Sequence, residues 1–165
     1  MKKRFLFLCS MLVLVFGGCS LKDSTYRYIG DVKEYRSIFI EPIPVKTFDI
    51  PEYGAFGSVV NTVKEKVDIR ATIAGELMKY GFLITQDPKD ENTLTVVYGE
   101  TGIFSQSGGG RPEVMIQMLD PKTKKLVFTC NAEGDRMNGI GGAYKDAVVR
   151  CLAGLESYYT PMMKK

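Results

Sequence analysis

The chain has 165 residues, the size of a single domain, and 45% of them are apolar, which is enough for one ordinary core. This composition does not indicate a disordered chain. The net charge of +3 comes entirely from Lys2, Lys3 and Arg4, because the 22 basic residues less these three equal the 19 acidic ones. A neutral domain without a long basic run has no field to attract nucleic acid, so we expect no nucleic-acid partner.

The first 18 residues have the order of a secretory signal. Lys2 to Arg4 are cationic, Phe5 to Phe16 form an apolar run, and Gly17-Gly18 supply small residues. The run is too short to cross a bilayer comfortably as a permanent helix. We therefore expect export, and an N-terminal anchor that is never cleaved is the alternative.

The sequence Phe16-Gly17-Gly18-Cys19 resembles the lipobox of bacterial lipoproteins, with Phe16 where that pattern usually has leucine. The resemblance implies that residues 1–18 are a lipoprotein signal peptide and that Cys19 begins the mature chain. Cys19 would then carry a diacylglyceryl thioether and a fatty acyl group such as palmitate, and two or three acyl chains hold a protein firmly on a membrane. Because Ser20 follows, the resemblance also implies the outer membrane, with the domain facing the periplasm or the cell surface.

Residues 20–36 are mostly polar, with scattered tyrosines and no sustained apolar period. They are typical of a flexible tether, although the tyrosines would also be able to dock on the domain, and the sequence does not decide between the two. The expected organisation is a signal peptide at 1–18, a lipidated tether at 19–36 and a single domain at 37–165.

The first elements of the domain are a strand, a loop and a helix. Residues 37–43 form a β-rich run that Pro42 and Pro44 stop, and residues 44–56 are expected to be a loop. From Ser58 to Tyr80, apolar residues recur at steps of three and four, and Gly81 supplies a stop. This spacing predicts a helix over 58–80.

Strands and a last helix follow. We expect strands at 82–85, 93–100, 113–119 and 126–133, with a turn at 120–123 that joins the last two as an antiparallel hairpin. A helix is predicted from about Gly142 to Tyr158, because its apolar residues form one stripe.

This order predicts an α+β two-layer sandwich, in which a largely antiparallel sheet of about 4–5 strands carries two helices on one face. In architecture the domain is weakly similar to small lipoproteins and periplasmic modules of outer-membrane assembly and secretion machines. No local motif carries that similarity, so it assigns no residue.

The sequence contains no histidine, which excludes Ser-His and Cys-His nucleophilic pairs and histidine-ligated zinc. We therefore predict no catalytic residue, no metal and no cofactor. Carboxylates near strand ends are interpreted as solvated loop charges; they are Glu100, Glu113, Glu133 and Asp135.

Two glycine-rich segments border the later strands. In residues 99–112, Ile103 and Phe104 either pack back on the domain or contact a partner. Residues 138–147 precede the last helix and are interpreted as a loop and helix start, with anion binding by backbone N–H groups as the alternative.

Cys130 and Cys151 fall on the apolar faces of a strand and of the helix expected to cover it. Export permits oxidation, so we predict that they form a disulfide; two buried thiols are the alternative.

These observations favour a non-enzymatic lipoprotein of the bacterial envelope, anchored through Cys19, whose domain binds an envelope protein or glycolipid. One alternative is a membrane-tethered hydrolase or glycan-active enzyme that uses carboxylates such as Glu100 and Glu113. It would require two carboxylates about 5–10 Å apart in a cleft. The other alternative is a carrier of hydrophobic ligands, which would require an apolar cavity between the sheet and the helices.

Overall fold

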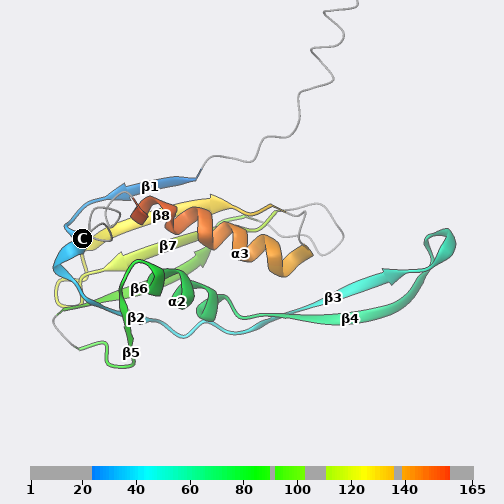
Figure 1. Ribbon diagram of the computed structural model, residues 1–165, viewed down its shortest axis with the longest axis horizontal. Helices are drawn as coiled ribbons and strands as arrows, with labels where there is room; N and C mark the ends of the chain where they lie inside the picture. The colour runs from blue at the N-terminus through cyan, green and yellow to red at the C-terminus, as the bar shows by residue number, and fades with distance from the viewer. Residues whose placement is uncertain (1–23, 90–91, 103–110, 136–138, 157–165) are drawn as a thin grey trace, which may run out of the picture.

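The computed structural model describes residues 24–89, 92–102, 111–135 and 139–156. Two α-helices, eight strands and three short 3-10 helices make up this part of the chain (Figure 1). The strands are β1 (Thr25–Tyr28), β2 (Ser37–Ile40), β3 (Lys46–Tyr53), β4 (Val59–Val67), β5 (Leu83–Thr85), β6 (Thr93–Glu100), β7 (Glu113–Leu119) and β8 (Leu126–Glu133). The helices are α2 (Ile69–Lys79) and α3 (Gly139–Leu152), and the 3-10 helices are η1 (Val32–Glu34), η2 (Ala55–Gly57) and η4 (Ala153–Leu155).

Six strands form one sheet in the order β1-β8-β7-β6-β2-β5. The pairs β1–β8, β8–β7 and β7–β6 are antiparallel, whereas β6–β2 and β2–β5 are parallel. Strands β3 and β4 form a separate two-stranded sheet that extends beyond the body of the molecule (Figure 1).

The core lies between one face of the large sheet and the two helices. In Figure 1 both helices lie on the same side of the sheet; α3 packs on β7 and β8, and α2 packs beside α3. The side chains that meet there are almost fully buried; they include Ile38, Leu94, Ile116, Phe128, Ile73, Leu77, Val148 and Leu152. No helix in the described ranges is both long enough and apolar enough to cross a membrane.

The structure confirms the mixed α+β class, with two helices and one large sheet. Strands were expected near 37–43, 82–85, 93–100, 113–119 and 126–133, and β2, β5, β6, β7 and β8 occupy these segments. Strands β7 and β8 form the expected antiparallel hairpin, with Ile116 opposite Cys130. The expected count of 4–5 strands was too low, because β1 and the β3–β4 sheet were not predicted.

The helix predicted over 58–80 is wrong in its first half. Residues Val59–Val67 form β4, and only Ile69–Lys79 form helix α2. The segment is rich in β-branched residues, which favour strands, and its apolar residues are mostly exposed, so their spacing does not mark a buried helical face. The helix instead begins after Asp68, whose carboxylate accepts a hydrogen bond from the Ala71 N–H at 2.8 Å.

The loop predicted at 44–56 is also wrong, because Lys46–Tyr53 form β3 and pair with β4. Pro51 lies within β3 in a sheet of only two strands, so its missing N–H removes no bond to a further strand. The Gly81 stop is confirmed, since Gly81 follows the helix with φ +89°.

The tyrosines near the N-terminus dock on the domain. Strand β1 pairs with the edge of β8, and the Tyr28 hydroxyl donates a hydrogen bond to the Gly154 carbonyl at 2.6 Å. The Tyr28 ring also lies 5.1 Å from that of Phe128. Residues Thr25–Tyr28 are therefore part of the sheet, and the short helix η1 follows them.

The predicted disulfide is present between Cys130 on β8 and Cys151 on α3, with Cα atoms 5.3 Å apart. It joins β8, the strand next to the edge strand β1, to the helix that covers the sheet. Both cysteines are buried, at 2% and 0% exposure.

A second long-range tie joins η1 to the β7–β8 turn. The Tyr35 hydroxyl donates a hydrogen bond to Asp120 Oδ2 at 2.6 Å, and Thr123 donates to Oδ1 of the same carboxylate through its N–H and its hydroxyl. The bond from Tyr35 and then those from Thr123 lower the pKa of Asp120 from 3.8 to about 2. Burial and then the bond to Asp120 raise the pKa of Tyr35 to about 12.

Because the pKa of Asp120 is lower in the folded chain than in the unfolded chain, its contribution to stability is complete above about pH 4 and is lost as the pH falls towards 2. We expect Tyr35→Phe to weaken this dependence by returning the pKa of Asp120 towards its ordinary value. Urea unfolding of both proteins at a series of acidic pH values measures the difference. Parallel curves for wild type and Tyr35→Phe would contradict the assignment.

The disulfide closes a loop over a sequence separation of 21 residues. We expect the double variant Cys130→Ala/Cys151→Ala to be less stable by about 3 kcal/mol, from the entropy that loop closure removes from the unfolded chain. Urea unfolding without reductant measures this loss, and in mass analysis the reduced wild type should be about 2 Da heavier than the oxidised form. Equal masses before and after reduction would show that the thiols are free.

Candidate functional site

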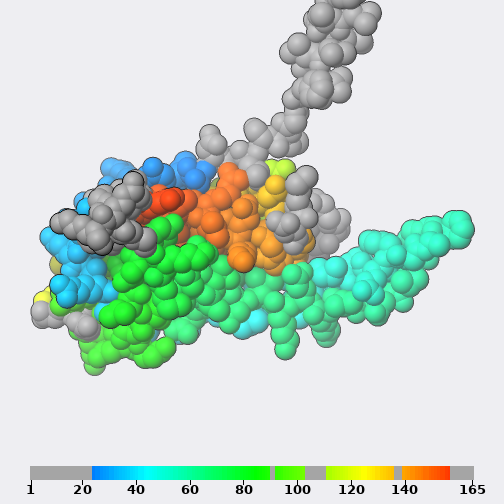
Figure 2. Space-filling model, in the orientation of Figure 1, coloured from blue at the N-terminus to red at the C-terminus, as the bar shows by residue number. Residues whose placement is uncertain are grey.

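The β3–β4 hairpin extends beyond the packed body of the domain. Residues Lys46 to Glu52 pair regularly with Val67 to Asn61, and the pairing shifts at a bulge between Glu52 and Tyr53. Figure 2 shows the hairpin projecting clear of the rest of the molecule. An isolated two-stranded hairpin is only marginally stable in water, so its base must be held by the body.

Apolar side chains gather at the free end of the hairpin and remain exposed to solvent. Five of them carry exposed fractions of 44% to 106%: Val63 44%, Val59 57%, Tyr53 66%, Val60 66% and Phe56 106%. We call Tyr53 to Val60 the hairpin tip; Val63 lies just below it, paired with Ile50. Apolar residues grouped in this way mark an interaction surface more often than apolar residues scattered singly.

The turn at the tip holds Phe56 in an unusual conformation. Phe56 has φ +73° and ψ +14°, in the left-handed region, followed by Gly57 at φ +75°. A side chain in this region costs about 1 kcal/mol. Since Phe56 is fully exposed, no packing within the chain offsets that cost.

A polar cluster holds the base of the hairpin on the body. Lys46 on β3 forms an ion pair with Glu100 at the end of β6, with Nζ 2.6 Å from Oε1 and 2.7 Å from Oε2. The Tyr98 hydroxyl donates to Glu100 Oε1 at 2.7 Å, and the Tyr144 hydroxyl on α3 lies 3.4 Å from Oε2. Three elements of the body and hairpin therefore converge on one carboxylate.

Apolar contacts complete the attachment. The buried Phe48 ring on β3 stacks on the Tyr144 ring with centroids 5.7 Å apart, and Lys46 Nζ lies 5.3 Å from the centroid of the same ring. Burial and then the bond to Glu100 raise the pKa of Tyr98, while burial and then the Glu100 charge raise that of Tyr144. Burial lowers the pKa of Lys46, but the hydrogen bonds and charges of Glu100 and Tyr144 together outweigh it, and the pKa is raised overall. At neutral pH the lysine of this cluster is therefore charged and its two phenols are neutral.

The second strand of the hairpin is attached at the start of α3. Glu65 on β4 accepts a hydrogen bond from the Gly141 N–H at 3.1 Å, so a carboxylate of the chain itself occupies this helix N-terminus. A Cβ at position 141 would collide with the Glu65 carboxylate, so a larger residue here would displace that carboxylate. The alternative interpretation of residues 138–147 was an anion site formed by backbone N–H groups. At Gly141 the Glu65 carboxylate of the chain itself takes the place of such an anion.

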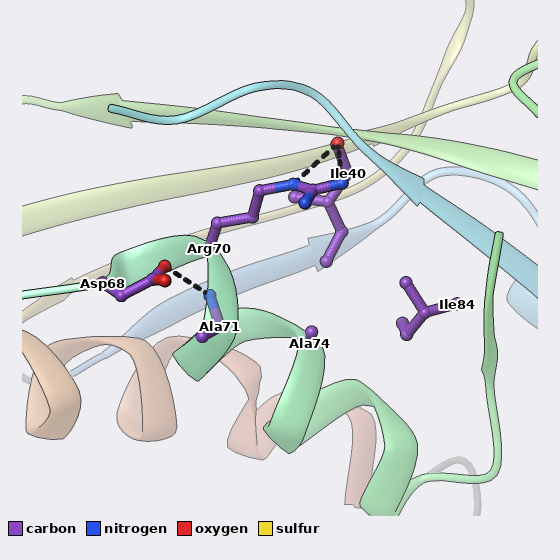
Figure 3. A pocket seen from close by; sticks show the side chains of 6 residues that line it. All are labelled: Ile40, Asp68, Arg70, Ala71, Ala74 and Ile84. Carbon is purple, nitrogen blue, oxygen red and sulfur yellow. Dashed lines mark hydrogen bonds between the residues drawn. The ribbon is translucent and has the colours of Figure 1, made fainter. Parts of the chain in front are cut away.

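Two clefts open beside Arg70 at the start of α2. One, of about 120 Å³, is lined by Ile40, Asp68, Arg70, Ala71, Ala74 and Ile84 (Figure 3), and one of about 350 Å³ is lined by Phe39, Ile40, Pro42, Ile43, Arg70 and Gln86. Arg70 donates two hydrogen bonds to the Ile40 carbonyl, both at 3.3 Å. Asp68 lines the smaller cleft and Gln86 the larger one, so neither cleft is purely apolar. The clefts lie at the edge of the sandwich, so they are not the cavity between sheet and both helices that a hydrophobic-ligand carrier would need.

Of the four carboxylates considered for catalysis, only Glu113 and Glu133 are paired across neighbouring strands, and Glu100 lies apart from them. Glu100 is paired with Val114, a residue of the buried face, whereas its neighbour Glu113 lies on the opposite face of the sheet. Glu113 is paired with Glu133 on that outer face, where Asn131 donates to Glu113 at 3.0 Å and Arg111 lies 4.0 Å from Glu133.

Asp135 bonds through its backbone N–H to Asp146 at 2.8 Å. None of the four carboxylates lines either cleft beside Arg70. Within the described ranges, no group of three or more cysteine, aspartate or glutamate side chains has the geometry to hold a metal ion.

Of the predicted site residues, Cys19, Ile103 and Phe104 lie outside the residues that the structure describes. The sequence analysis missed the hairpin tip because it assigned 44–56 to a loop and 58–80 to a helix. A usable signal was present: Gly54 and Gly57 flank a turn between two runs of β-branched and aromatic residues.

No protein-family model matches the chain, and the search of curated proteins finds no match. Among solved structures, the fold is distantly similar to a PelC dodecamer from Paraburkholderia phytofirmans in space group P6. That likeness has a TM-score of 0.45 and 11% identity over 79% of this chain and 96% of that one. A substituted form of the PelC dodecamer in space group C2 gives 0.46 and 12% over 80% and 96%. Likenesses this distant carry no argument about function, so the site is interpreted from its own geometry.

The Glu100 cluster predicts how the hairpin responds to mutation. Glu100→Ala removes the shared acceptor of Lys46 and Tyr98, and we expect a loss of about 1–2 kcal/mol, limited by the partial exposure of the ion pair. Amide hydrogen exchange in β3 and β4 should rise as the base of the hairpin loosens.

Glu52→Ala is the matched control, because Glu52 bonds only to Asn61 at the far end of the hairpin among the bonds described here. Its effect should stay within about 0.5 kcal/mol. Urea unfolding and exchange measured by mass spectrometry test both variants. Equal losses for the two variants would refute the role of the cluster.

Proposed function

We propose that this protein is a non-enzymatic lipoprotein of the bacterial envelope, anchored through Cys19, whose domain binds another envelope component with the β3–β4 hairpin. The observation that carries the binding role is the exposed apolar tip, held away from the body by a base that is firmly attached. The lipid anchor is proposed from the sequence of residues 1–19, and the outer membrane is its proposed location.

The arrangement supports binding better than catalysis. Glu100, a residue that the enzyme alternative needs, already accepts hydrogen bonds from Lys46 and Tyr98. Glu113 points to the other face of the sheet, so the two do not form a cooperating pair. A binding module needs only a surface, and the tip supplies one.

The anchor is tested in cells that process lipoproteins. Wild-type protein should incorporate radiolabelled palmitate and enter the detergent phase, and Cys19→Ala should do neither. Continued labelling of Cys19→Ala would refute the anchor.

Binding by the hairpin is tested in the same cells with a photo-crosslinking amino acid in place of Phe56. We expect a discrete adduct with an envelope lipid, glycolipid or protein, and a weaker one in the Cys19→Ala background. The control places the same group at Lys122, an exposed residue in the β7–β8 turn. Absence of an adduct at position 56, or the same adducts from position 122, would refute the role of the hairpin.

A further inference from the structure

The chemistry and position of the hairpin tip identify one class of partner. We infer that Tyr53 to Val60 enter the interface of the lipid bilayer in which Cys19 is anchored, so that the protein meets its membrane at two points. This rests on the proposed function, because it takes the anchor at Cys19 as given.

The first argument is the composition of the tip. No charged residue occurs from Tyr53 to Val63, and the large apolar side chains exposed there are aromatic or β-branched. Aromatic rings and aliphatic side chains are the groups that partition into the boundary between headgroups and acyl chains.

The second argument is the shape of the tip. It is a narrow projection with Phe56 fully exposed at its end (Figure 2). A protein partner would need a matching hollow to bury such a projection, whereas lipid molecules rearrange around it.

The third argument is the state of the backbone. Peptide groups that leave water must keep their hydrogen bonds. At the tip, the Gly54 N–H donates to the Ser58 carbonyl at 2.8 Å, and the Gly57 N–H donates to the Gly54 carbonyl at 3.2 Å. The turn therefore satisfies part of its own polar backbone.

The fourth argument is that the anchor and the hairpin leave from the same end of the body. Strand β1 is antiparallel to β8, which runs parallel to β6 and therefore to β2. The start of β1 thus lies at the end of the sheet where β2 stops and the chain continues into the hairpin (Figure 1).

The lengths of the two segments allow both to reach one membrane. The six residue steps from Cys19 to Thr25 span at most about 20 Å. Ile50 on β3 still packs against the core, and the three steps from it to Tyr53 rise roughly 10 Å before the turn begins. A membrane at that end of the body is within reach of both.

Charged residues limit the depth of the contact. Glu52 lies just before the tip and accepts a hydrogen bond from Asn61 at 3.1 Å. Lys64 and Lys66 are exposed further down β4, at a level where they would face lipid phosphates. The contact is therefore shallow and leaves the body of the domain in water.

The experiment uses the absence of tryptophan from the chain, which makes Phe56→Trp a single reporter. The full chain is produced in a bacterial host, extracted from its membranes and reconstituted into vesicles of phosphatidylethanolamine and phosphatidylglycerol. We expect the protein to float with the vesicles, the indole emission to shift to shorter wavelength, and quenching by acrylamide to fall several-fold. Lipids brominated on their acyl chains should quench the emission.

Two further variants complete the design. Tyr53→Trp provides a second reporter at the tip if Phe56→Trp does not fold. Leu83→Trp is the matched control, because Leu83 is 68% exposed, close to the 66% of Tyr53, and is paired with Ser37 at the opposite end of the sheet. Its indole should stay accessible to acrylamide and unaffected by brominated lipid.

The possible results distinguish failure of the membrane contact at the tip from failure of the anchor at Cys19. Protein that floats while both tip indoles remain as accessible as that of Leu83→Trp overturns the membrane contact and leaves the anchor intact. A tip indole shielded from acrylamide but not quenched by brominated lipid also overturns it, in favour of a protein surface such as a second copy. Protein that does not float overturns the anchor and with it the contact that depends on it.

Discussion

The attachment of the hairpin to the body depends on the Glu100 carboxylate, where Lys46 from the hairpin meets Tyr98 and Tyr144 from the body. A two-stranded hairpin alone does not bury enough apolar surface to stay ordered. Phe48 against Tyr144 supplies apolar burial, and the ion pair fixes the position of β3 over the end of β6. Because Glu65 fixes β4 on the start of α3 in the same way, both strands leave the body in a defined direction.

The base of the hairpin is also connected to both helices of the body. Strand β4 ends at the buried Val67, and the next residue, Asp68, is the N-cap of α2. The hairpin and the helix therefore share one junction. The Cys130–Cys151 bond holds α3 on the sheet, and α3 carries Tyr144, the ring against which Phe48 packs. The base of the hairpin therefore packs on a helix that is covalently joined to the sheet.

Strands such as β7 could be predicted from the sequence because their side chains alternate between buried and half-buried, with Val114, Ile116 and Met118 buried. Helix α3 could be predicted because its stripe is also buried. The hairpin could not be predicted in this way, because Val59, Val60 and Val63 have a spacing that resembles a helix but face solvent. Spacing identifies an element only where one face is buried, and at the tip neither face is.

Side-chain contacts, like the elements, could be predicted from the sequence only in part. The disulfide partners could be predicted because both cysteines fall on buried faces, whereas the role of Glu100 as an acceptor depends on contacts between residues distant in sequence, such as Lys46. Asn131, which bonds to Glu113, and Glu65, which bonds to Gly141, gave no local signal for the same reason.

The positions of charged residues and proline along the hairpin favour an arrangement in which another surface covers its tip. Exposed strand edges invite pairing with other chains, and charges or proline oppose it. The paired strands below the tip, which we call the stalk, have both, with Pro51 in β3 and the run Lys64-Glu65-Lys66 in β4. The tip has neither, although its apolar side chains carry the same risk of aggregation. In the proposed arrangement the lipid anchor confines the tip near a bilayer, and this high local concentration allows even a weak interfacial contact to remain occupied. Protection is then needed only on the stalk, which stays in water.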